Sequence, residues 1–184
     1  MNESILIVDD EAMIRDLLSS ALTQEDYSCH QAPNVDEAFK ILNTEAIDLV
    51  ISDIMMPGKS GVDLLRELKQ VNMDIAVLMI TGLTDMNTAM ECIRLGADDY
   101  ISKPFSISRV LLTVRNMLDK RLLAIEKRNY QASLEIKVLE QTEQIRNTMH
   151  DLHFAYENTL TALVKALDAR EKEVGSHSER VMNY

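Results

Sequence analysis

Hydrophobic and polar positions form alternating blocks through the first 105 residues. Runs of strand length, mostly apolar, occur at five places: Ile5–Val8, Ser28–Ala32, Leu49–Ser52, Ala76–Ile80 and Asp99–Ile101. Amphipathic stretches with helical spacing lie between them: Glu11–Gln24, Val35–Leu42, Val62–Lys69 and Asn87–Leu95. Strands that alternate with helices predict βαβ units, and therefore an α/β fold around a parallel sheet of five strands.

A different pattern begins after Phe105, because no Gly or Pro occurs from there to Val174. Positions three and four apart form a first, mainly apolar series at Leu118, Leu122, Ile125, Asn129, Ala132, Ile136 and Leu139. A second series follows at Val138, Thr142, Ile145, Met149, Leu152, Tyr156, Leu160, Leu163 and Leu167. The two series are out of phase by about one residue. The pattern predicts a long helix, partly a coiled coil, with a local change of winding near Val138–Leu139.

The length of this helix indicates a partner. A helix from Ser106 to Leu167 would span roughly 90 Å, and a small domain cannot cover its apolar stripe. We expect a second copy of the chain to cover it, which makes the protein a homodimer. Asn129 either fixes the register of the coiled coil or points to solvent. Gly175 is expected to end the helix.

Charge is unevenly distributed along the chain, whose net charge is −11. Residues 1–105 carry 7 Lys and Arg against 19 Asp and Glu, whereas residues 106–184 carry 12 against 11. The acidity of the first part argues against nucleic-acid binding by charge alone.

Cys29 and Cys92 form neither a disulfide framework nor a metal motif. No signal peptide or bilayer-length apolar run is found, so we expect a cytoplasmic protein without membrane contact.

Chemically active residues recur at the ends of the predicted strands. These residues are Asp9, Asp10, Asp53, Thr81, Tyr100, Lys103 and Pro104. Each follows its own strand, and in an open α/β sheet the carboxyl ends of the strands face one crevice. Three carboxylates, a hydroxyl and an ammonium would share that pocket.

This set of groups suits Mg²⁺ and a phosphoryl group. Mg²⁺ prefers oxygen ligands, which Asp9 or Asp10 could supply together with Asp53. Asp53 could attack phosphorus and form an aspartyl phosphate, while Lys103 and Thr81 contact phosphoryl oxygens. Taken singly, these residues have simpler explanations, such as Asp10 capping the helix that starts at Glu11. Their joint occurrence makes coincidence remote.

Four segments, ILIVDDE (Ile5–Glu11), VISDIMMPGKSG (Val50–Gly61), LMITG (Leu78–Gly82) and GADDYISKPF (Gly96–Phe105), resemble a response-regulator receiver domain over residues 4–118. The resemblance implies a doubly wound fold with strand order 2-1-3-4-5. It assigns Asp53 as phosphoacceptor, Asp9 and Asp10 as Mg²⁺ ligands, and the Met55 backbone carbonyl as a further ligand. It also makes Thr81 the switch hydroxyl, Tyr100 the switch aromatic and Lys103 the phosphoryl-reading lysine. A cis Lys103-Pro104 bond and a partner histidine kinase are further implications.

Two apolar positions near the site, Met55 and Leu83, could hinder a hydrolytic water, which predicts slow loss of the phosphoryl group. Lys59 could contact the site, but a solvated loop lysine is the favoured interpretation.

The last stretch, TLTALVKALDAREKEVGSHSERV (Thr159–Val181), resembles the opening of an HD-GYP domain, a metal-dependent cyclic di-GMP phosphodiesterase. In that resemblance Glu173 and His177 match metal-ligand positions of a di- or trinuclear site. Their spacing suits one helix face, but Gly175 between them makes a loop equally compatible. The rest of that domain is absent, so this chain alone is expected to be no enzyme.

Two other output classes stay open. His177 could be a degenerate phosphoacceptor of a hybrid histidine kinase, or the chain could be a truncated DNA-binding response regulator. The resulting domain hypothesis has a receiver at residues 1–118, a coiled-coil signalling helix at 119–157 and the start of an output domain at 158–184.

Overall fold

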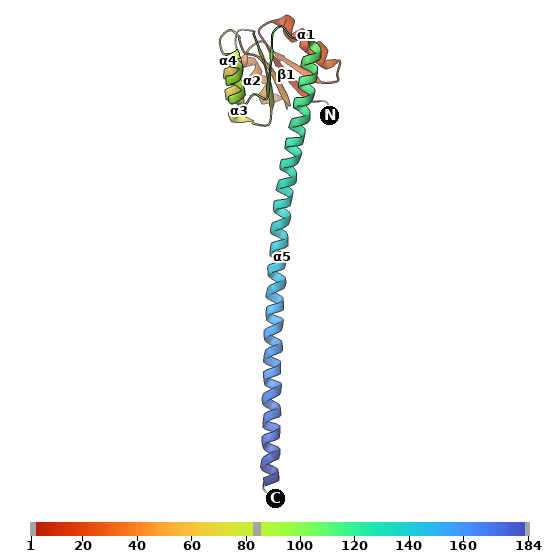
Figure 1. Cartoon of the computed structure of the whole chain (residues 1–184), viewed down its shortest axis with the longest axis vertical. Coiled ribbons are helices and arrows are strands. Elements are labelled where there is room, and N and C mark those ends of the chain that lie inside the picture. Colours follow the sequence, from red (N-terminus) through yellow and green to blue (C-terminus); the bar gives the residue numbers. More distant parts are fainter. Residues whose placement is uncertain (1–2, 83–85, 183–184) are drawn as a thin grey trace. The chain divides into compact units, whose positions relative to one another are not determined.

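A computed structural model describes the backbone of residues 3–82 and 86–182, and the side chains of these residues except 86–87, 89, 168–169 and 171–182 (Figure 1). The chain divides into two units, Met1–Arg128 and Asn129–Tyr184. Each unit is described by itself below.

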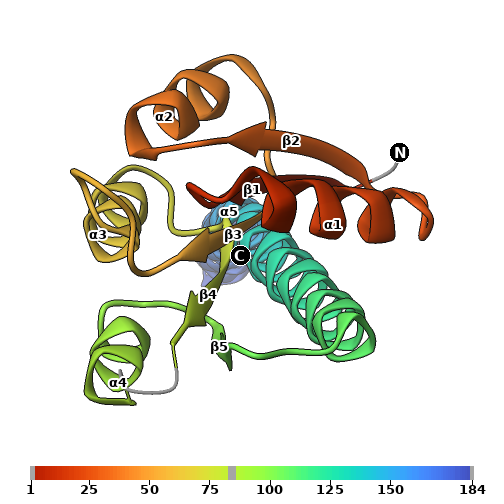
Figure 2. The same ribbon diagram turned by 90° about the horizontal axis from the view of Figure 1, so that it is seen from above.

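The first unit contains a five-stranded parallel sheet (Figure 2). Its strands are β1 (Ser4–Val8), β2 (Ser28–Ala32), β3 (Leu49–Asp53), β4 (Ala76–Thr81) and β5 (Asp99–Ser102). Its helices are α1 (Ala12–Thr23), α2 (Val35–Thr44), α3 (Gly61–Val71), α4 (Met86–Arg94) and the first part of α5 (Ile107–Met182). The strands run in the order β2-β1-β3-β4-β5, which confirms the predicted α/β fold and strand order.

Helices cover both faces of this sheet. On one face, side chains of α2, α3 and α4 pack with strand residues such as Leu6 and Val50. On the other face, α1 and the first turns of α5 pack with Ile5 and Ile51. Neighbouring residues of one strand therefore enter opposite cores, and a central strand must be apolar at almost every position. This requirement explains the unbroken apolar runs of the sequence.

Local capping fixes the start of two helices close to the predicted positions. The Ser60 side chain accepts a hydrogen bond from Asp63 N, and the Asp63 side chain accepts one from Ser60 N, which forms a capping box at the start of α3. Asn34 caps α2 by accepting from Glu37 N. Such caps satisfy backbone N–H groups that the helix itself leaves free.

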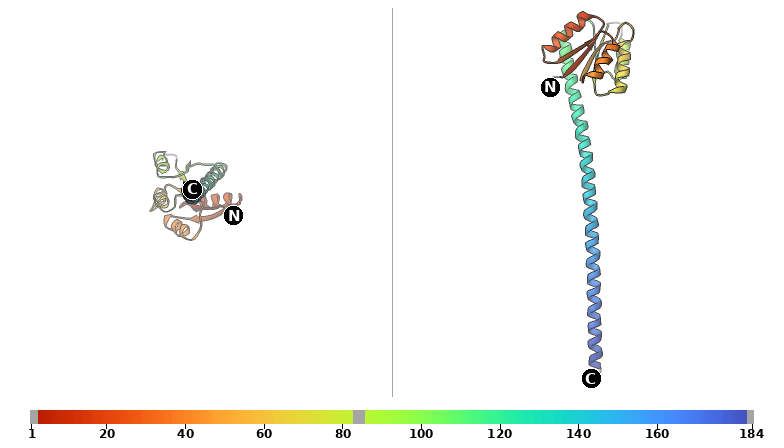
Figure 3. Two further views of the ribbon diagram at one scale, coloured as in Figure 1. Left: turned by 90° about the horizontal axis from the view of Figure 1, so that it is seen from below. Right: turned by 180° about the vertical axis from the view of Figure 1, so that it is seen from behind.

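The long helix α5 runs without interruption from Ile107 to Met182 (Figure 3). The expectation that Gly175 ends the helix is therefore wrong. A glycine inside a helix costs only about 1 kcal/mol relative to alanine, and unlike proline it keeps its backbone N–H. Helix-forming residues such as Glu171 and Lys172 precede Gly175, and they favour continuation.

Within the first unit, α5 contributes Val110, Val114, Met117 and Leu118 to the core. In the second unit, every residue from 129 to 167 is exposed. A search of the described residues found no helix with the length and apolar character needed to span a bilayer.

Gly61 permits the close approach of α3 to the end of β3. A Cβ at this position would lie 2.8 Å from Ser52 Oγ and would overlap the Asp53 carbonyl oxygen. We expect Gly61→Ala to lower the free energy of unfolding by about 2–3 kcal/mol, because the backbone of Asp53 must shift. Urea denaturation measures this change. The matched control is Lys59→Ala on the exposed side of the same loop, which we expect to cost under about 0.5 kcal/mol. Equal effects of the two variants would contradict this account.

Candidate functional site

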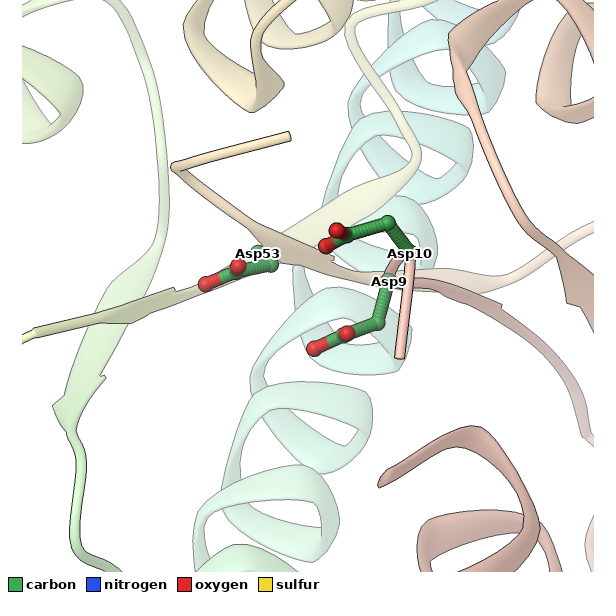
Figure 4. Close-up of side chains that lie close together, drawn as sticks. All are labelled: Asp9, Asp10 and Asp53. Carbon is green, nitrogen blue, oxygen red and sulfur yellow. The ribbon is translucent and has the colours of Figure 1, made fainter. Parts of the chain in front are cut away.

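Most of the predicted site residues meet at the carboxyl edge of the sheet. Asp53 and Thr81 are the last residues of β3 and β4, Asp9 and Asp10 follow β1, and Lys103 follows β5. Carboxylate oxygens of Asp9, Asp10 and Asp53 lie within 4.8 Å of one another (Figure 4). The crevice expected from the parallel topology therefore holds the three acidic groups.

The backbone holds Asp9 and Asp53 out of water. The two residues are only 1% and 6% exposed, whereas Asp10 is exposed. After β3, Ile54 N donates to Ile80 O at 2.9 Å, and Gly61 N donates to Ile54 O at 3.1 Å. These bonds fix the chain that follows Asp53 against its neighbours. Asp9 is fixed differently, because its Oδ1 accepts from Glu11 N at 2.8 Å.

Lys103 places its ammonium among the carboxylates. Its Nζ lies 3.2 Å from Asp9 Oδ2, 3.4 Å from Asp53 Oδ1 and 3.7 Å from Glu11 Oε1. The Lys103 N–H donates to Thr81 O at 2.6 Å, which ties the end of β5 to the end of β4. The Lys103-Pro104 bond is cis, which confirms that prediction.

Burial and charge oppose each other at this site. Burial raises the pKa of the Asp53 carboxyl above its ordinary value, and the nearby Asp9 raises it further, although Lys103 pulls it down. Burial would lower the pKa of Lys103, but the charges of Asp53 and Asp9 and their hydrogen bonds outweigh it, so that this pKa is raised. The pocket therefore favours the protonated form of Lys103 and makes ionisation of Asp53 less favourable than in water.

The donor set fits a hard divalent cation. Asp9, Asp10 and Asp53 offer carboxylate oxygens only, and Mg²⁺ favours a few carboxylates together with water and phosphate oxygens. A cation among these groups would favour the charged form of Asp53, whose pKa is raised mainly by burial and further by Asp9.

The two predicted switch residues differ in position. Thr81 is 2% exposed at the end of β4, and its hydroxyl donates to Gly82 O at 3.2 Å. Tyr100 is the second residue of β5 and does not follow its strand, so that part of the prediction is wrong. Asp99 pairs with Leu78, so the strand begins at the predicted residue and includes Tyr100. The half-buried Tyr100 packs against the core that α2, α3 and α4 cover.

Two supporting residues escaped the sequence analysis. The half-buried Arg15 of α1 donates from Nη1 to Asp9 O at 2.7 Å and to Asp10 O at 3.1 Å. An arginine one turn into the helix that follows an acidic pair is the signal that could have identified it. The buried Ser52 hydroxyl donates to Asp53 O at 3.0 Å, and nothing in the sequence distinguishes it from an ordinary strand serine.

The remaining predicted positions have exposed side chains or lie outside the described residues. Lys59 is half-exposed and pairs with Glu67 at 3.2 Å and Asp36 at 3.8 Å, in agreement with a solvated loop lysine. The Met55 side chain is 68% exposed. Leu83 lies outside the described residues, as do the side chains of Glu173 and His177.

Curated relatives include proteins with different outputs. The chain is 37% identical over 120 residues to the phosphate regulon transcriptional regulatory protein PhoB of Pseudomonas aeruginosa, covering 64% of this chain and 52% of PhoB. It is 26% identical over 182 residues to a cyclic di-GMP phosphodiesterase of Thermotoga maritima, covering 97% of this chain and 48% of that protein. It is also 33% identical over 183 residues to the response regulator SaeR of Staphylococcus epidermidis, covering 95% of this chain and 76% of SaeR. The chain thus spans about half the length of the first two.

Solved structures match the first unit. The receiver domain of NtrX from Brucella abortus superposes with a TM-score of 0.61 at 38% identity, covering 62% of this chain and 98% of that domain. The family model of the response regulator receiver domain matches residues 5–115. These residues contain the sheet, the acidic cluster and Lys103. The chain therefore belongs to the response regulator receiver family.

Proposed function

We propose that Asp53 accepts a phosphoryl group in a reaction that requires Mg²⁺. The observation that carries this proposal is the joint approach of Lys103 Nζ to Asp53 and Asp9, beside the cluster of three carboxylates. Asp9, Asp10, Asp53 and the Met55 backbone carbonyl would hold the cation. The cation supplies charge neutralisation for the incoming anionic phosphodonor.

Each residue then has a defined part in the transfer. An oxygen of the Asp53 carboxylate attacks phosphorus, so that an O–P bond forms while the bond from phosphorus to the donor group breaks. Lys103 stabilises a phosphoryl oxygen as a point charge. The Thr81 hydroxyl, which now donates to a backbone carbonyl, turns to donate to another phosphoryl oxygen. Positioning and charge do most of the work in this class of reaction.

The phosphodonor that we propose is a partner histidine kinase, and a reaction of this kind takes place in the cytoplasm. Movement of Thr81 towards the phosphoryl group would leave space beside β4 for Tyr100 to turn inward. This change alters the surface formed by α4, β5 and α5, and α5 carries it onward.

The long helix is proposed to join two copies of the chain. The apolar side chains of residues 129–167 are all exposed in the second unit, and a parallel coiled coil would bury them. In this proposal the receiver occupies residues 1–118, the signalling helix 119–157 and the start of the output domain 158–184.

The output that we propose is a cyclic di-GMP phosphodiesterase of the HD-GYP class. The similarity to the Thermotoga maritima phosphodiesterase extends over the long helix and supports this choice, together with the tail segment Thr159–Val181. Glu173 and His177 would contribute to a di- or trinuclear metal site in that domain. The similarity to PhoB favours a transcriptional output as the second candidate, while a kinase with His177 as phosphoacceptor ranks behind both.

Phosphorylation can be tested with a small acyl phosphate and intact-protein mass spectrometry. We expect one phosphoryl group per chain in the presence of Mg²⁺, none without a divalent cation, and none on Asp53→Asn. Lys103→Ala should slow the reaction at least tenfold, because the phosphoryl oxygens lose their charged partner, whereas Lys59→Ala should leave the rate unchanged. The phosphoryl group should persist for minutes or longer. Full labelling of Asp53→Asn would refute the assignment, and a half-life of seconds would refute slow loss.

Thermal unfolding tests the electrostatics of the pocket. The raised pKa of Asp53 means that folding disfavours its charged form. The cost to stability is therefore absent below the ordinary value of 3.8, grows as the pH rises from there to the folded pKa, and is complete above the folded pKa. We expect Asp53→Asn to raise Tm at pH 7 by several degrees, and the gain to vanish near pH 4. Mg²⁺ at 10 mM should raise the Tm of the wild type more than that of Asp53→Asn.

The control for this measurement is Asp36→Asn, which removes an exposed carboxylate and should change Tm little at either pH. A Tm of Asp53→Asn below that of the wild type at pH 7 would contradict the expected cost of burying the Asp53 charge.

The output is tested with a chain that continues past Tyr184, incubated with cyclic di-GMP and a divalent metal. We expect hydrolysis to the linear dinucleotide or GMP at a rate that responds to the phosphodonor in the wild type and not in Asp53→Asn. Absence of turnover under every condition would exclude the hydrolase and leave the receiver assignment intact.

A further inference from the structure

One face of the second unit carries a mainly apolar stripe that contains no charged residue. We call it the 130–167 stripe, and its members are Tyr130, Leu134, Val138, Thr142, Ile145, Met149, Leu152, Tyr156, Leu160, Leu163 and Leu167. Steps of three or four residues separate them, as expected for one side of a helix. The large apolar members are between 42% and 69% exposed, so the second unit itself leaves the stripe uncovered.

The alternative seam begins at Leu118 and passes through Ile136 and Leu139. Its first residue is only 7% exposed because it belongs to the core of the first unit, which accounts for its apolar character without a partner. Continued past Leu139 with steps of four and three, this series reaches Glu143 and Arg146. Charged residues are depleted from the centre of a buried helix seam, so this series is a poor interface beyond Leu139.

Hollows on the helix surface lie along the stripe. One is lined by Met149, Leu152, His153 and Tyr156, and another by Gln141, Gln144, Ile145, Thr148 and Met149. The first consists of residues i, i+3, i+4 and i+7, which is the arrangement that receives a side chain from a facing helix in knobs-into-holes packing. The stripe therefore offers the positions that knobs-into-holes packing uses.

Charges at the edges of the stripe match a second copy. Glu135 follows Leu134 on one edge, and Lys137 precedes Val138 on the opposite edge. In a parallel, in-register pair, opposite edges of the two helices face each other. Lys137 would then lie beside Glu135 of the partner subunit, and the same pair would form twice by symmetry.

We propose that a second copy of the chain packs, parallel and in register, along the 130–167 stripe. This inference rests on the proposed dimer and specifies its interface. Asn129 and Ile136 lie outside the seam, and no change of phase at Val138–Leu139 is needed. Ten steps cover the positions from 130 to 167, or about 3.7 residues per step. This period lies above the 3.5 of left-handed coiled coils and close to the 3.67 of an 11-residue repeat, so the two helices would run nearly straight or with a slight right-handed twist.

Cysteine cross-linking discriminates between the two seams. Leu134→Cys and Val138→Cys are placed on the stripe, and Ile136→Cys and Leu139→Cys are the matched variants on the alternative seam. Under mild oxidation we expect disulfide-linked dimers at positions 134 and 138 at least ten times faster than at 136 and 139. The wild type provides the background from Cys29 and Cys92, which are half-buried and buried. Faster cross-linking at 136 and 139 would overturn the proposal.

Charge exchange gives a second, independent measurement. Glu135→Lys should weaken the dimer in analytical ultracentrifugation by placing like charges opposite each other, and the double variant with Lys137→Glu should restore it. Failure of the double variant to restore the dimer would count against the parallel register.

Measurements on the wild type distinguish failure of the proposed dimer from failure of the proposed interface. A wild type that is monomeric at all concentrations would reject the dimer itself. A dimer that cross-links only at 136 and 139 would reject this interface alone.

Discussion

Burial of charged groups at the carboxyl edge of the sheet is the constraint around which the first unit is built. Asp9 and Asp53 are nearly inaccessible to water, Asp10 completes the cluster, and Lys103 provides a single ammonium among them. Backbone hydrogen bonds at the strand ends fix Asp9 and Asp53 in place, and the ion pairs of Lys103 with both carboxylates offset part of the cost of burying them. In the proposed function, a cation and a phosphoryl group would offset the rest of that cost.

The sequence was sufficient for the sheet and most of the site, and the reason is physical. A strand covered by helices on both faces must be apolar at nearly every position, so its ends are visible where Asp53 or Thr81 interrupts the run. The sequence was insufficient for the place of Tyr100 relative to its strand, because β5 has only four residues and Tyr100 lies inside it, paired with Met79 of β4. It was also insufficient for Arg15, whose contacts are with backbone carbonyls and leave no pattern in side-chain polarity.

The long helix shows a further limit of sequence periodicity. Periods of 3.5 and 3.6 residues differ by only about 20° per heptad, so two apolar series on one helix are difficult to separate over a few turns. Burial separates them, since Leu118 is enclosed by the first unit whereas Leu134 is 42% exposed. The first series thus starts inside the core of the first unit, whereas the second lies on the exposed surface of the second unit along its whole length. A single helix can therefore satisfy two different cores with two different faces.

Contacts at the opposite edge of the sheet determine how a change at Asp53 can reach α5. Arg121 donates from Nε to Asp74 O at 2.7 Å and pairs through Nη1 with Asp48 at 2.9 Å, while Arg128 pairs with Asp74 at 2.6 Å. The helix is thus anchored to the loops before β3 and β4, and its start is joined to the site through β5 and Lys103. A rigid helix fixed at both ends of a domain cannot shift at one end alone. If phosphorylation moves β5, as the proposed function requires, the part of α5 in the first unit must either rotate as a whole or break the Arg121 anchor.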